Sequence, residues 1–170
     1  MKLIATRRSR TDKVDDLRCV RRDGSATGCP MPRQGILPHD LVHYVVESTL
    51  GWRHAFYGMI AAGADIGPAM EQAHDASDAG NAALADQAIH AEAVVESLQA
   101  QLWAAGSDRD AFDPAMFDEG VRSACAGRGR SVPALPPDTG RRLFDAVLAL
   151  DARWRQVPWH GALELDLPDR

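Results

Sequence analysis

Two histidines and two carboxylates occur within nine positions of the segment ILPHDLVHYVVESTLG, and they are the strongest candidates for chemistry in this chain. On a helix, His39 and His43 lie one turn apart on the same side, where their imidazole rings can share a metal ion. Together with Asp40 and Glu47 they form one polar stripe that faces away from the main apolar arc. We therefore expect His39 and His43 to bind a divalent metal such as zinc, with Asp40 and Glu47 as acid-base groups or supports of the ligands.

The pentapeptide HDLVH resembles the HExxH motif of the zincin metallopeptidases over five of the 170 residues. The resemblance implies hydrolase chemistry in which His39 and His43 bind zinc and Asp40 takes the position of the general base. Aspartate is shorter than glutamate by a methylene group, so it would hold the attacking water differently. The glycine and third histidine of the extended metzincin motif are absent, because the matching positions are Val46 and Thr49.

One helix cannot supply a complete site. The axial rise from His39 to Glu47 is about 12 Å, whereas a zinc–ligand bond is about 2 Å. His43 can share an ion with His39 or with Glu47, but the three side chains together would be strained. The remaining ligands must come from other elements, and the candidates are Asp65, Glu71, His74 and His90.

Two alternatives stay open at this helix. Glu47 could set the tautomer of His43 for acid-base catalysis without a metal, although no GxSxG nucleophile motif accompanies it. The cluster could instead be only a polar helix face, because Asp40 suits the first turn and the pair His43–Glu47 contributes about 0.2 to 0.5 kcal/mol. A competing function is a non-catalytic interaction protein or homo-oligomer, whose partner is an unknown protein or small molecule.

The elements that must position this helix include strands near both ends of the sequence. The segments KLIATRR, DDLRCVRR and SATGCPMP predict a three-stranded meander with a tight turn at Asp23-Gly24. GALELDLP near the C-terminus alternates with period two and predicts a further strand. Both ends should join in one small, mainly antiparallel sheet, and the acidic residues Glu164 and Asp166 then have basic candidates for cross-strand pairs. Those candidates are Arg7, Arg18 and Arg22.

Helical periodicity fills the middle of the chain. We predict helices over 38–50, 52–63, 82–105 and 114–124 and a last helix through 143–154. Ala55, Gly58 and Ala62 form a stripe of small residues that favours a close helix crossing. The Gly- and Pro-rich segment 126–140 is interpreted as a connector. The fold class is therefore α+β, with the sheet packed by four to five helices in a single domain over 1–170.

Composition narrows the class of protein. The chain is 45% hydrophobic and 25% charged, as in ordinary globular domains. Residues 1–35 carry a net charge of +5 and the rest −10, but a nucleic-acid-binding ribbon is disfavoured because no aromatic residue precedes Tyr44. Three cysteines without a CxxC pair, no signal-peptide core and no long apolar run favour a soluble, cytoplasmic protein outside the membrane. The excess of arginine over lysine and the abundant alanine are typical of a bacterial sequence.

Overall fold

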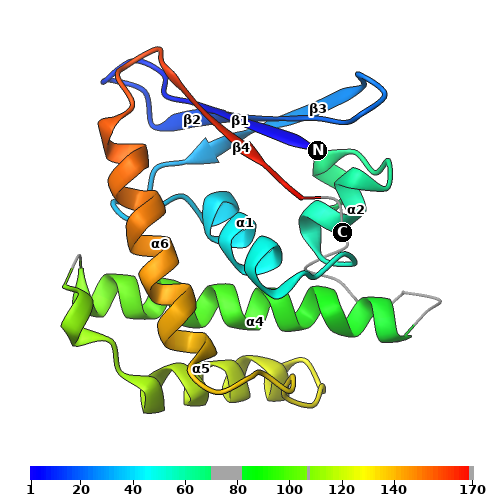
Figure 1. The fold of residues 1–170 in the computed structure, drawn as a ribbon, viewed down its shortest axis with the longest axis vertical. Coiled ribbons are helices and arrows are strands. Elements are labelled where there is room, and N and C mark those ends of the chain that lie inside the picture. Colours follow the sequence, from blue (N-terminus) through cyan, green and yellow to red (C-terminus); the bar gives the residue numbers. More distant parts are fainter. Residues whose placement is uncertain (70–81, 107, 169–170) are drawn as a thin grey trace.

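The computed structural model describes residues 1–69, 82–106 and 108–168. It confirms the predicted α+β fold (Figure 1). The strands are β1 Lys2–Thr6, β2 Val14–Val20, β3 Ala26–Pro32 and β4 Ala162–Asp166. The helices are α1 His39–Leu50, α2 Phe56–Ala61, α4 Ala82–Ala105, the 3-10 helix η2 Arg109–Ala111, α5 Pro114–Gly127 and α6 Thr139–Gln156.

The sheet joins both ends of the described chain in the antiparallel order β3-β2-β1-β4. Gly24 has a φ of 85° in the turn between β2 and β3, a conformation that glycine adopts without strain. Pro30 and Pro32 lie in β3, at an edge of the sheet, where a missing N–H costs no ladder hydrogen bond. The apolar face that this pattern predicts is buried: Leu3, Ala5, Leu17, Cys19, Met31 and Leu165.

The predicted cross-strand charge pairs were wrong in their partners. Glu164 accepts a hydrogen bond from Lys2 Nζ at 2.8 Å, because β4 pairs with β1 and not with β2, which carries Arg18. Arg7 instead donates from Nη1 to the carbonyl oxygen of Val157 at 2.8 Å. Strand order, which the sequence pattern does not define, therefore decided which charges meet.

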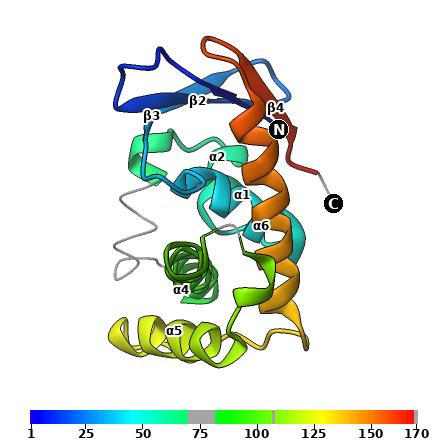
Figure 2. The ribbon, with the colours of Figure 1, turned by 90° about the vertical axis from the view of Figure 1, so that its left-hand side faces the viewer.

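Helix α1 lies between the sheet and α4, as Figure 2 shows from the side. It ends at Gly51, which has the left-handed φ of 68° expected for that position. Pro38 is the residue before the first helical residue, not the first helical residue as predicted. Because elements cover α1 on both sides, its apolar residues and most of its polar stripe are buried together.

Helix α2 is shorter than predicted and begins at Phe56. The backbone N–H groups of Arg53 and His54 donate to Gln87 Oε1 at 2.7 and 2.6 Å, which holds the preceding residues in a loop. Gly58 does allow a close approach, and the atoms nearest to it belong to this loop. A Cβ atom at Gly58 would lie 1.9 Å from the carbonyl oxygen of Arg53.

The later helices agree with their sequence patterns. Helix α4 has the predicted bounds and is followed by Gly106 with a φ of 62°. Asp113 caps α5 by accepting hydrogen bonds from the backbone N–H groups of Ala115 and Met116 at 2.9 and 3.1 Å. Residues 128–138 connect α5 to α6, so the connector is shorter at both ends than the predicted 126–140. Among the helices of the described residues, none combines the length and apolar character needed to cross a bilayer.

Candidate metal centre

The structure brings His39 and His43 of α1 together with Glu92 of α4. The Nε2 atom of His43 lies 3.1 Å from Glu92 Oε1, and the Nε2 atom of His39 lies 3.7 Å from Glu92 Oε2. One donor atom from each of the three side chains falls within 4.8 Å of the other two. Donors around a tetrahedral zinc ion lie about 3.4 Å apart for bonds of about 2.1 Å, so small side-chain movements would bring this trio to bonding distance.

Glu92 is buried with an incomplete set of partners. Only 2% of the residue is exposed. Its Oε2 atom has no hydrogen-bond partner within the described residues, since 3.7 Å to His39 is too long for a hydrogen bond. A buried carboxylate oxygen without a partner is costly, and a cation bound beside it would remove that cost.

Glu47 supports His43 from the other side of the ring. Its Oε1 atom lies 3.3 Å from His43 Nδ1, which leaves Nε2 directed to Glu92. The same carboxylate accepts hydrogen bonds from the backbone N–H groups of Tyr57 at 2.9 Å and Gly58 at 3.2 Å. A carboxylate on the distal nitrogen of a metal-binding histidine is a recurrent arrangement that fixes its tautomer and orientation.

The electrostatic contacts of the cluster favour a protonated His43 ring between the carboxylates of Glu47 and Glu92. Burial lowers the pKa of His43, but hydrogen bonds to Glu47 and Glu92 outweigh this effect and raise the pKa to about 10. Burial raises the pKa of Glu92, whereas its contacts with His39 and His43 hold that pKa well below its usual value. Without a metal, the cluster therefore holds an imidazolium, and a divalent cation can take the place of its Nε2 proton.

Asp40 is buried beside this cluster, with 5% of its surface exposed. Burial raises the pKa of its carboxyl group, and the nearby charges of His39 and His43 oppose that rise. Asp40 is not one of the three side chains whose donor atoms converge. It therefore lies next to the candidate ligands without being one of them.

Two of the other candidate ligands, His90 and Asp65, are not part of the cluster. His90 uses Nε2 to contact the carbonyl oxygen of Ser131 at 2.8 Å, and Asp65 is exposed at the surface. Glu71 and His74 lie outside the described residues. Access from solvent is on the side of His39, whose side chain is 27% exposed.

Glu92 was missed by the sequence reasoning. In the sequence, Glu92 is a single carboxylate within a run of apolar residues. The structure buries these residues, Ala91, Ala93, Val94 and Val95. A charged residue at such a position needs a partner, because an unpaired buried charge is costly. That argument identifies Glu92 as unusual, but it does not identify α1 as the element that faces it.

Comparisons with known proteins add no family or function here: no protein-family model, curated protein or solved structure matches this chain.

Proposed function

We propose that His39, His43 and Glu92 bind a divalent metal ion, with zinc as the first candidate, and that the centre supports hydrolysis. The observation that carries the proposal is the buried Glu92 carboxylate, which faces both histidines and has one oxygen without a hydrogen-bond partner among the described residues. Two imidazoles and one carboxylate are also the three protein ligands of many catalytic zinc sites.

The surroundings suit a bound cation. His43 and Glu92 are almost fully buried, so their orientation is fixed by packing between α1 and α4. Glu47 holds the distal nitrogen of His43 and would raise the basicity of the ligand. The same three donors also suit iron and other divalent transition metals, so the choice of metal needs a direct measurement.

Hydrolysis is supported by the number of ligands and by Asp40. A divalent ion held by three protein ligands leaves a position open and supplies a Lewis acid that lowers the pKa of water. Glu47 already accepts three hydrogen bonds, from His43, Tyr57 and Gly58, so it is better suited to support than to proton transfer. Asp40 is the remaining buried carboxyl group next to the histidines and is our candidate general base.

Elemental analysis of purified, untagged protein tests the metal. We expect about one equivalent of zinc or another divalent transition metal after reconstitution, and loss of that metal in His43→Ala. His39→Ala serves as a second variant, since His39 is partly exposed and its replacement disturbs the core less. His54→Ala, at an exposed position, is the control that should keep the metal. Folded wild-type protein without metal after reconstitution would contradict the proposal.

Asp40→Asn tests the hydrolytic part. The variant should retain the metal and lose turnover of activated esters, amides or phosphate esters by about 100-fold or more, as expected for removal of a general base. Unchanged turnover in metal-loaded Asp40→Asn would exclude Asp40 from that role.

The alternative function is a non-catalytic interaction protein. Large hydrophobic side chains are exposed at four positions of the described residues: Trp103, Met116, Val132 and Trp159. Ala55, from the stripe of small residues, and the neighbouring Phe56 are instead buried within this chain. This alternative gains support if neither metal nor turnover is found.

A further inference from the structure

Helix α2 has no capping side chain of its own. The residue before it is Ala55, which offers no side-chain acceptor to the first N–H groups of the helix. Those of Tyr57 and Gly58 donate instead to Glu47 of α1, at 2.9 and 3.2 Å. Glu47 therefore serves as a cap from another helix, and its negative charge suits the positive end of α2.

The same carboxylate contacts the candidate metal ligand His43 through Nδ1 at 3.3 Å. The Glu47 side chain is fully buried. Movement of α2 away from Glu47 would leave a buried carboxylate with His43 as its one remaining hydrogen-bond partner within the described residues. Displacement of His43 would likewise remove one of the three donors that hold the Glu47 charge.

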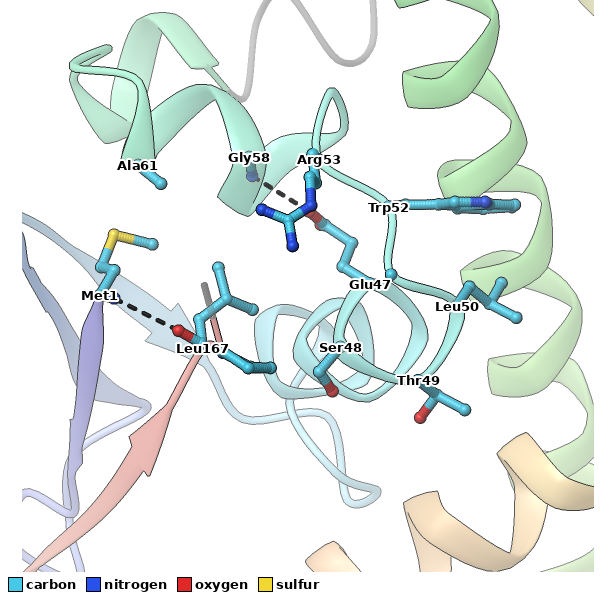
Figure 3. A pocket seen from close by; sticks show the side chains of 12 residues that line it. Met1, Glu47, Ser48, Thr49, Leu50, Trp52, Arg53, Gly58, Ala61 and Leu167 are labelled. Carbon is cyan, nitrogen blue, oxygen red and sulfur yellow. Dashed lines mark hydrogen bonds between the residues drawn. The ribbon is translucent and has the colours of Figure 1, made fainter. Parts of the chain in front are cut away.

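Helix α2 also forms part of a surface pocket of about 200 Å³ at the C-terminal end of α1. Figure 3 shows Glu47 reaching toward Gly58, with Arg53 extending into the pocket from the loop before α2. Gly58 and Ala61 lie on one side of this pocket, and Leu167 near the C-terminus lies on another. The position of α2 therefore determines the shape of the pocket.

We propose that Glu47 is a positioning residue that couples the metal centre to α2, so that metal binding stabilises α2 against the pocket and stable docking of α2 strengthens metal binding. The inference rests on the proposed metal site. A metal on Nε2 fixes the His43 ring with its Nδ1–H directed at Glu47, which in turn holds the α2 cap. By linkage, the two effects must be equal in size.

Because the two effects are equal, the change in metal affinity also limits how strongly metal stabilises α2. Loss of a group that orients a metal ligand typically lowers metal affinity by about 10- to 100-fold. Opening of α2 leaves the contact between His43 and Glu47 in place, so this range is the upper limit of the factor by which metal slows opening of the α2 N-terminus. The amide protons of Tyr57 and Gly58 report this opening directly, because both are donated to Glu47.

Amide hydrogen exchange of these two residues, measured by NMR with and without Zn²⁺, tests the proposal. In the wild type, Zn²⁺ should slow exchange at both residues by a measurable factor of up to about 100. In Glu47→Gln, Zn²⁺ should still bind, with affinity lower by about 10- to 100-fold, and the slowing should be lost. Glu96→Gln, an equivalent change at an α4 residue paired with Arg128, should behave as the wild type.

Two results would overturn the coupling. One is stoichiometric Zn²⁺ binding by the wild type with unchanged exchange at Tyr57 and Gly58. The other is equal slowing in Glu47→Gln. The wild-type measurement stands without the variant, so an unfolded Glu47→Gln does not prevent the test. A titration of folded wild type with Zn²⁺ distinguishes these results from failure of the metal site. If no Zn²⁺ binds, the metal site itself is rejected, together with this inference.

Discussion

His43 and Glu92 face each other across the contact between α1 and α4, with Nε2 and Oε1 3.1 Å apart and both side chains almost fully buried. On its other nitrogen, His43 contacts Glu47 at 3.3 Å. One imidazole thus joins a carboxylate from a second helix to a carboxylate from its own helix.

Glu92→Gln should lower zinc affinity by more than about 100-fold, because it replaces a charged ligand by a neutral amide of the same shape. Loss of a residue that only supports a ligand lowers affinity by about 10- to 100-fold, and loss of a ligand should cost more. Isothermal titration with Zn²⁺ measures this loss. Glu96→Gln, one turn further along α4, is the control and should bind as the wild type, since its ion pair with Arg128 is partly exposed. Equal affinities of wild type and Glu92→Gln would remove Glu92 from the ligand set.

Zinc binding should release about one proton at pH 7. The pKa of His43 is about 10 in the metal-free protein, so its ring is protonated and Nε2 must lose a proton before it can bind a metal. Apparent affinity should then rise about tenfold for each pH unit between pH 6 and 8. Titration calorimetry in two buffers of different ionisation enthalpy counts the protons. A count of zero would mean that His43 is neutral without metal.

The metal-free protein should lose stability as the pH rises above neutrality. The pKa of His43 is raised from 6.5 to about 10 on folding, so its contribution is complete below pH 6.5 and is lost as the pH approaches 10. The pKa of Glu92 is lowered from 4.5, so its contribution is present above pH 4.5 and is lost in acid. Urea unfolding in the presence of a chelator, at pH 6, 8 and 10, should show a falling free energy of unfolding. His43→Ala should flatten this decline, and His54→Ala should preserve it.

Gly58→Ala should destabilise the protein by about 1 to 3 kcal/mol, as overpacking typically does. The added Cβ would lie 1.9 Å from the carbonyl oxygen of Arg53, so the loop before α2 must move. Gly127→Ala is the matched control, because an added Cβ there meets no atom within 4 Å. The control should be neutral or slightly stabilising, by up to about 1 kcal/mol. Urea denaturation of both variants measures the difference, and equal stabilities would contradict the close approach at Gly58.

The candidate site divides into a part that is local in sequence and a part that is not. His39 and His43 are separated by one helical turn, so the sequence alone predicts that their rings are neighbours. The ring contact is present, with centroids 4.7 Å apart. The sequence also showed that α1 could not complete the site, because its axial rise separates His39 from Glu47. It did not identify Glu92, since helical periodicity places residues on faces without stating which faces meet.

The burial of the polar stripe was likewise decided by tertiary packing. An isolated α1 would expose Asp40, His43 and Glu47 to water, and their interactions would be weak. In the folded chain α4 and α2 cover them, and their exposed fractions fall to between 1% and 5%. Removal from water strengthens each electrostatic contact and makes every missing partner costly.

The sequence by itself determined the α+β class, the strands at both ends, most helix bounds and the pairing of His39 with His43, because periods, caps and turns act between residues close in the chain. The tertiary structure alone decided that Lys2 pairs with Glu164, that Glu92 faces His43 and that Glu47 caps α2. Those contacts join residues far apart in sequence or on separate elements. They depend on how the elements pack, which local propensity does not encode.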